Sequence, residues 1–142
     1  MQTPFYVYDL ERLNETIRVA KNAANRYGYH IHYAVKANYD LKVNALLASN
    51  NIGADCVSGN EILHALKCGF DAQKIVFAGV GKTDEEIKTA LRSGIACFNV
   101  ESHQEILVIN EIAKKNNIIA KIAIRVNPNV DADTHHHITT GL

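Results

Sequence analysis

The chain has 142 residues, of which 47% are apolar and 21% are charged, and its 15 basic residues balance its 15 acidic ones. This composition is that of a globular domain with a sizeable core, and the balanced charge argues against nucleic acid or an anionic membrane as partner. No apolar run is long enough to span a bilayer, no signal peptide is visible, and 3 cysteines without a C-x-x-C pair predict reduced, buried thiols in a cytoplasmic protein.

Short apolar runs and amphipathic segments alternate along the chain. The apolar runs predict strands at residues 30–35, 53–57, 75–78, 95–100 and 118–126. Apolar residues at helical spacing, together with capping residues, predict helices at residues 9–27, 41–49, 59–68, 83–94 and 102–116. A further strand-like run at residues 5–8 comes before the first of these helices.

Helix boundaries are marked by caps. Asp40 is placed to cap the helix over 41–49. The segments Thr83-Asp84-Glu85-Glu86 and Ser102-His103-Gln104-Glu105 both have the pattern of a capping box, in which the first and last side chains bond each other's backbone. Gly94 ends the helix that Thr83 opens.

The order of these elements indicates an α/β domain built on a parallel sheet, because helices separate strands that are near-continuous apolar runs. In such folds ligands bind at the carboxyl ends of the strands. Polar residues or glycines lie at or just after the end of every predicted strand. They are Lys36, Asn38, Asp55, Ser58, Gly79, Gly81, Asn99, Glu101, Arg125 and Asn127.

Lys36 is the candidate reactive residue. It follows a buried strand directly, where a charged amine is costly, so we expect its pKa to fall. A neutral amine is a nucleophile and forms a Schiff base with an aldehyde, as pyridoxal phosphate enzymes require. The alternative is a lysine that extends into solvent or pairs with a carboxylate.

Five segments together carry a resemblance to a known family: YAVKAN (33–38), GADCVSGNEI (53–62), FAGVGKTDEEI (77–87), FNVES (98–102) and RVNPNVDADTHHHITTGL (125–142). In order and spacing they resemble the N-terminal part of the ornithine/diaminopimelate/arginine decarboxylases, which are fold-type III pyridoxal phosphate enzymes. Within that family, the first residues and the second and last segments are most similar to the diaminopimelate decarboxylases. The resemblance covers essentially the whole chain.

The resemblance implies a fold and a set of site residues. It implies that residues 1–142 are the N-terminal portion of an alanine racemase-like (β/α)8 barrel that binds pyridoxal 5'-phosphate. Lys36 would be the catalytic lysine that forms the Schiff base with the cofactor, and Asp55, Glu61 and Arg125 would line the cofactor site. The implied reaction is decarboxylation of meso-2,6-diaminopimelate to L-lysine, in a homodimer that acts on a small amino acid.

Each of these residues also has an ordinary structural interpretation. Asp55 can simply end a strand, Glu61 can form a capping box with Ser58, and Arg125 can be one half of an ion pair. Cys56 has no visible base beside it, which favours a buried thiol over a nucleophile. The run at 135–137, with its neighbouring aspartates, lacks a ligand spacing of known geometry, so we predict a loop and no metal site.

Several alternatives remain open at this point. A closed barrel needs about 250 residues, so we expect the remaining cofactor contacts elsewhere and this piece to be inactive alone. The substrate could be another basic amino acid or a polyamine precursor. A complete flavodoxin-like binding or signalling domain suits the length, although the first strand–helix connection has no acidic pair and no phosphate loop. A small carrier of pyridoxal phosphate without decarboxylase activity is a further possibility.

Overall fold

The structure is a computed structural model that describes residues 2–128. Its centre is one sheet of five strands in the order β1-β2-β3-β4-β5, and all neighbouring strands are parallel. The strands are β1 (His32–Ala34), β2 (Gly53–Cys56), β3 (Ile75–Phe77), β4 (Cys97–Val100) and β5 (Ile122–Ile124).

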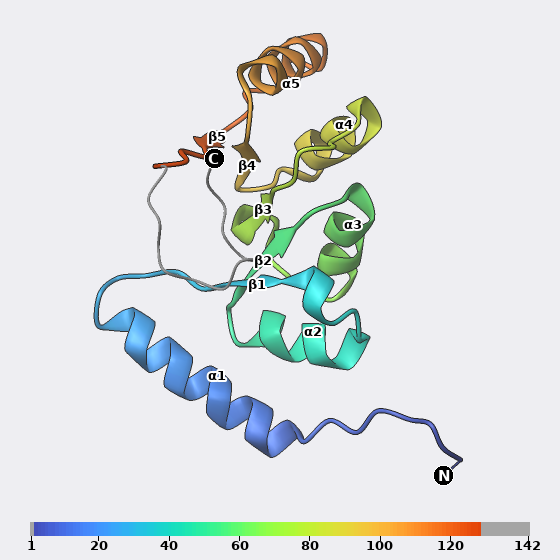
Figure 1. Cartoon of the computed structure of the whole chain (residues 1–142), viewed down its shortest axis with the longest axis vertical. Coiled ribbons are helices and arrows are strands. Elements are labelled where there is room, and N and C mark those ends of the chain that lie inside the picture. Colours follow the sequence, from blue (N-terminus) through green and yellow to red (C-terminus); the bar gives the residue numbers. More distant parts are fainter. Residues whose placement is uncertain (1, 129–142) are drawn as a thin grey trace.

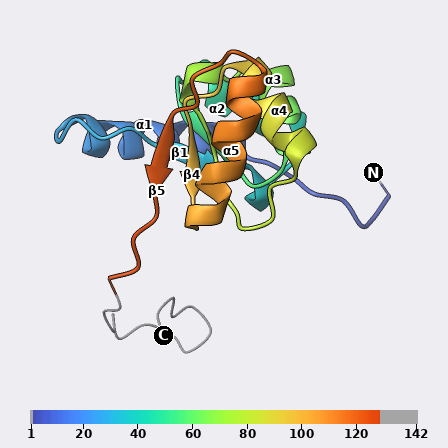
Figure 2. The same cartoon turned by 90° about the horizontal axis from the view of Figure 1, so that it is seen from above.

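Helices separate the strands as the sequence predicts. They are α1 (Leu10–Asn25), α2 (Leu41–Ser49), α3 (Gly59–Lys67), α4 (Asp84–Ser93) and α5 (His103–Lys115), with two 3-10 turns, η1 (Val35–Ala37) and η2 (Ala72–Lys74). Helices α2 to α5 follow one another along one side of the sheet, and α1 lies at its β1 end (Figure 1). Figure 2 shows α2 to α5 gathered on one side of the strands, with α1 apart from them. No helix among residues 2–128 is long and apolar enough to cross a membrane.

The hydrophobic core lies between the sheet and these helices. Alternate strand residues point to opposite faces, and one face carries side chains that are at most 1% exposed: Ala54, Cys56, Ile75, Phe77, Phe98 and Val100. Strand residues between them, such as Asp55, Val76 and Asn99, are only half-buried. Within residues 2–128 the helices therefore cover one face of the sheet and leave the other open.

The strand order decides between two of the predicted architectures. A flavodoxin-like domain has the strand order 2-1-3-4-5 and helices on both faces of its sheet. Here the order is sequential and the helices between the strands share one face, which is the arrangement of a (β/α)8 barrel. The flavodoxin-like alternative is therefore wrong, and the barrel-type α/β fold is confirmed.

All five predicted strands are longer in the sequence pattern than in the structure, and the two outer ones, β1 and β5, are shortened the most. The run at 30–35 pairs only from His32 to Ala34, because Val35 starts a 3-10 turn, and the run at 118–126 pairs only over Ile122–Ile124. Each of these strands has a neighbour on one side alone among the described residues, β2 for β1 and β4 for β5. The apolar run at residues 5–8 is extended and exposed and pairs with no strand of the described chain.

Candidate functional site

The polar residues that follow the strands share one edge of the sheet because all five strands are parallel. Lys36 lies in η1 directly after β1, Asp55 is the third residue of β2, and Arg125 follows β5. Gly79 and Glu101 follow β3 and β4. This edge, called the carboxyl edge below, is where the sequence predicts a site.

Lys36 differs from the prediction in its environment. Val35 before it is fully buried, yet the Lys36 side chain is exposed, because the strand has already ended and η1 turns the chain outward. The side chain makes no hydrogen bond or ion pair with residues 2–128. Burial therefore does not desolvate this amine within the described chain. What the structure supplies instead is a fixed backbone with an unengaged primary amine.

Asp55 brings an unpaired carboxylate oxygen to the same edge. It pairs in register with Ala34 of β1 and Val76 of β3, on the open face of the sheet. Its Oδ1 atom is buried and has no hydrogen-bond partner among the described residues. A buried carboxylate oxygen without a partner is costly in a folded protein. Asp55 is therefore a candidate to contact a ligand.

Glu61 lies at the start of α3, as the capping interpretation predicts. Ser58 Oγ accepts a hydrogen bond from Glu61 N at 3.2 Å, and Glu61 Oε2 accepts one from Val57 N at 2.8 Å. The glutamate thus reaches the residue before the cap rather than the cap itself, so the predicted reciprocal box is only half formed. At Thr83 both halves are present.

Glu86 joins the first turns of α3 and α4. Its Oε1 accepts from Gly59 N at 2.8 Å and its Oε2 accepts from Thr83 N at 3.0 Å, and these bonds lower the pKa of the carboxyl group. A Cβ atom at Gly59 would lie 2.8 Å from Glu86 Cγ. The close approach of the two helices therefore requires glycine at this position, and a side chain of the protein already occupies this end of α3.

Arg125 is held by a carboxylate that sequence reasoning did not assign to it. Arg125 Nη1 donates to Glu101 Oε2 at 2.9 Å, while Glu101 Oε1 accepts from Gly79 N at 3.2 Å. Glu101 is mostly buried, with 16% of its side chain exposed. One carboxylate thus ties together the ends of β3, β4 and β5. The predicted ion-pair role of Arg125 is present, and its guanidinium is fixed at the carboxyl edge.

A buried lysine completes this network. Lys82 Nζ, on a side chain that is 1% exposed, donates to Gly79 O at 2.6 Å, to Asn99 O at 2.9 Å and to Glu105 Oε1 at 2.5 Å. Glu105 Oε2 accepts from Glu101 N at 2.8 Å, so this glutamate, like Glu61, reaches past the predicted cap. The Lys82 ammonium also lies 5.3 Å from the centre of the Phe77 ring.

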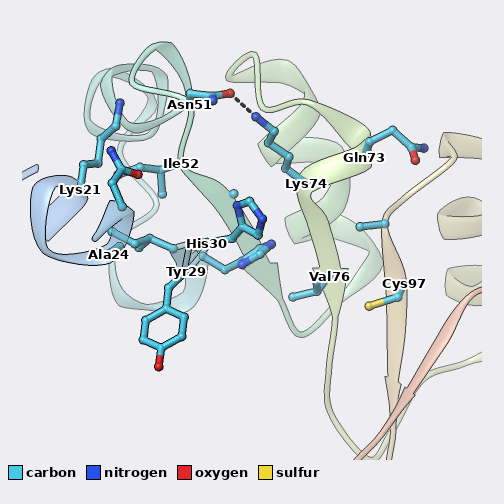
Figure 3. A pocket seen from close by; sticks show the side chains of 15 residues that line it. Lys21, Ala24, Tyr29, His30, Asn51, Ile52, Gln73, Lys74, Val76 and Cys97 are labelled. Atoms are coloured by element: carbon cyan, nitrogen blue, oxygen red, sulfur yellow. Dashed lines mark hydrogen bonds between the residues drawn. The ribbon is translucent and has the colours of Figure 1, made fainter. Parts of the chain in front are cut away.

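A cavity in the described part of the chain lies elsewhere. It measures about 550 Å³ and is lined by residues at the amino ends of the strands and on α1, among them Lys21, His30, Gly53 and Lys74. Figure 3 shows the Lys74 ammonium reaching the side-chain oxygen of Asn51 across its rim. None of Lys36, Asp55, Glu61 or Arg125 lines it. Chemistry in parallel α/β folds occurs at the opposite edge, so we assign the site by its residues and not by this cavity.

Comparison with known proteins decides the family. Residues 10–142 match the family described as "Pyridoxal-dependent decarboxylase, pyridoxal binding domain". The chain belongs to this family.

Individual relatives agree with that assignment. A diaminopimelate decarboxylase from Bacteroides thetaiotaomicron is 53% identical over 143 aligned residues, covering 100% of this chain and 37% of the relative. One from Campylobacter jejuni is 47% identical over 99% of this chain and 35% of its own length. The crystal structure of the Helicobacter pylori diaminopimelate decarboxylase with L-lysine superimposes with a TM-score of 0.88 at 44% identity, covering 100% of this chain and 36% of that one. The chain thus spans about a third of each relative.

The residues at the carboxyl edge fit the cofactor of this family in two respects. Pyridoxal phosphate is held by a primary amine, and Lys36 presents an exposed amine without a partner among residues 2–128. The buried Oδ1 of Asp55, without a hydrogen-bond partner among residues 2–128, is a second group that could accept a hydrogen bond from a ligand. The segment at 135–137, for which a loop without metal is predicted, lies outside the described residues.

Cys56 is the buried thiol that the sequence predicts. It is 0% exposed on the covered face of β2. Burial, with further contributions from Glu61 and Asp55, raises its pKa to about 12. A thiol that stays protonated is a poor nucleophile, so Cys56 contributes packing next to Asp55.

A buried histidine gives the domain a pH-dependent stability that can be measured. His64 on α3 is 7% exposed, and burial followed by the charge of Lys67 lowers its pKa below the usual 6.5, against an opposing effect of Glu61. As the pH falls through 6.5, the unfolded chain takes up this proton first. The contribution of His64 to stability is therefore fully present above that pH and is lost as the pH falls toward its lower pKa in the folded state.

We expect His64→Phe, which keeps an aromatic ring, to make unfolding less sensitive to acid. The readout is the unfolding midpoint of wild type and variant on both sides of pH 6.5. Burial also lowers the pKa of His32, so the slope should shrink and not vanish. Identical slopes would show that His64 does not titrate with unfolding.

Proposed function

We propose that this chain is part of the cofactor-binding barrel of a diaminopimelate decarboxylase, and that the whole protein removes the carboxylate of meso-2,6-diaminopimelate to give L-lysine and CO2. The observation that carries the proposal is the exposed Lys36 amine, which has no hydrogen-bond or ion-pair partner among residues 2–128, at the carboxyl edge of a sheet with barrel topology. The identities of 53% and 47% to diaminopimelate decarboxylases support the choice of substrate. A homodimer located in the cytoplasm belongs to the same proposal and rests on the family resemblance.

Each candidate residue has a role that follows from its contacts. Pyridoxal phosphate supplies an aldehyde that an amine can attack and a ring that accepts electrons during decarboxylation. Lys36 supplies the amine, and η1 fixes the backbone that carries it. Asp55 supplies a buried carboxylate oxygen that has no hydrogen-bond partner among residues 2–128. Arg125, which donates a hydrogen bond to Glu101, places a cation at the β5 end of the carboxyl edge, whereas Lys36 lies at its β1 end.

Glu61 is the fourth residue that we assign to the cofactor site. Its Oε2 atom is engaged by Val57 N, which holds the carboxylate next to the carboxyl end of β2. A carboxylate fixed in this way strengthens the negative charge around Asp55. Its contribution to the site is electrostatic, in addition to its part in starting α3.

The experiment that tests this function is an assay of the whole protein with a panel of amino acids. Meso-2,6-diaminopimelate, ornithine and arginine are incubated separately with the protein, with and without pyridoxal phosphate, and released CO2 and amine product are quantified. We expect turnover of diaminopimelate that depends on the cofactor. Preference for ornithine or arginine would show that the protein is a decarboxylase of the same family with a different substrate. Cofactor binding without any CO2 release would indicate a carrier.

A further inference from the structure

The loop that joins Lys36 to α2 is held by one buried side chain. Asn44, on the first turns of α2, is 0% exposed. Its Nδ2 atom donates to Asn38 O at 2.9 Å and to Asp40 O at 2.8 Å. A single amide group therefore bridges both ends of the short segment that follows Lys36.

The orientation of this amide is fixed by chemistry. Both neighbours are carbonyl oxygens, which only accept hydrogen bonds, so the nitrogen of Asn44 must face them. The other end of the side chain, Oδ1, is buried and has no hydrogen-bond partner among the described residues. A buried unpaired oxygen is unfavourable, and an apolar residue of similar size would avoid it. The presence of asparagine here, despite the cost of the unpaired oxygen, indicates that the position is used for the two hydrogen bonds that the amide donates to the loop.

Further contacts fix the same loop on either side of Lys36. Val35, immediately before the lysine, is fully buried, and its carbonyl accepts from Asn38 N at 3.1 Å. Asn38 Oδ1 accepts from Asp40 N at 2.8 Å. Tyr39 stacks on His64 of α3, with ring centres 3.6 Å apart and planes inclined by 21°. The backbone around Lys36 is thus determined from several directions, while the lysine side chain is exposed.

We propose that Asn44 is a positioning residue that holds the loop carrying Lys36 so that its amine meets the cofactor aldehyde in a fixed geometry. The inference rests on the proposed function, since it assigns Asn44 a part in the attachment of pyridoxal phosphate to Lys36. The hydrogen bonds of the Asn44 side chain go to the backbone carbonyls of Asn38 and Asp40, and none goes to Lys36. A reactive side chain keeps its productive geometry only when neighbouring residues fix the backbone that carries it.

Two variants of the whole protein test the proposal. Asn44→Asp keeps the size of the side chain but sets carboxylate oxygens against the carbonyls, and Asn44→Leu removes both donors. Asn50→Asp is the matched control, because Asn50 Nδ2 also donates to a backbone carbonyl, Leu46 O at 2.9 Å, at the far end of α2. Each protein is mixed with pyridoxal phosphate, the absorbance of the covalent adduct is followed, and borohydride reduction with peptide mapping reports the share at Lys36.

We expect both Asn44 variants to slow attachment at Lys36 roughly tenfold or more, and to lower its share relative to the other lysines. The Asn50 control should remain within about twofold of wild type. Folding is checked by thermal unfolding. A merely structural role would lower the unfolding temperature without changing the selectivity for Lys36, and folded Asn44 variants that attach the cofactor at the wild-type rate would overturn the inference.

A second measurement, on the wild-type protein, tests whether the loop after Lys36 is held in place even if the variants do not fold. In hydrogen exchange, the amides of Asn38 and Asp40 should exchange as slowly as those of α2, because each donates a bond inside the held loop. Exchange as fast as in the exposed residues 5–8 would overturn the inference. Wild-type protein without preferential attachment at Lys36 would overturn the proposed function instead, and with it this role of Asn44.

Discussion

Replacing Lys36 with arginine is expected to abolish decarboxylation by the whole protein, with a loss of roughly a thousandfold or more. Arginine keeps the positive charge and most of the length of lysine, but its guanidinium does not condense with an aldehyde. The Lys36 side chain is exposed and makes no hydrogen bond or ion pair with residues 2–128 that arginine would break. The loss should therefore appear in kcat without a change in folding.

Lys114→Arg is the matched control for this experiment. Lys114 is exposed on α5, whereas Lys36 follows β1 at the carboxyl edge. The control should keep wild-type activity and wild-type absorbance of the bound cofactor. A Lys36→Arg protein that still turns over diaminopimelate at a rate near that of wild type would show that another amine carries the reaction.

Replacing Lys82 with methionine is expected to produce the largest loss of stability in the domain. The ammonium is buried with three acceptors around it, and its removal takes this donor away from Glu105 Oε1 and from two backbone carbonyls. Breaking a buried pair by removing one partner costs about 3–5 kcal/mol. In the whole protein this is measured by native-state hydrogen exchange of the amides of β3 and β4, whose opening free energy should fall by that amount.

An exposed ion pair on α5 provides the comparison. Lys115 and Glu111 are 2.6 Å apart, with 70% and 67% of their side chains exposed. Lys115→Met makes the same chemical change as Lys82→Met, but it should cost less than about 1 kcal/mol because water solvates the remaining carboxylate. Equal losses in the two variants would mean that the Lys82 network does not hold the carboxyl edge together.

The sequence predicts well what is decided within a few residues. The capping box at Thr83 and the left-handed Gly94 that ends α4 follow from local backbone chemistry, and both are present. The alternation of strands and helices follows from periodicity in the same way. The strand limits of β1 and β5 were too wide, because an apolar run shows that a segment is buried and does not show where pairing with a neighbour ends.

Contacts between distant segments could not be predicted from local patterns. Lys82 and Glu105 are 23 residues apart, and the pattern around Glu105 indicates a helix cap, which is only part of what its carboxylate does. Asn44 is an unremarkable polar residue within a helix until the fold brings the carbonyls of the preceding loop against it. The sequence left the exposure of Lys36 as one of two alternatives, because it depends on the turn η1 that follows the short strand.

The most direct test of the central claim is to identify which lysine of the whole protein binds pyridoxal phosphate. The protein is incubated with the cofactor, reduced with borohydride, digested, and mapped by peptide mass spectrometry. We predict a single dominant modification at Lys36, with the other lysines at the background level of the untreated protein. Uniform modification of the lysines, or a dominant site elsewhere with Lys36 unmodified, would contradict the assignment of the carboxyl edge as the cofactor site.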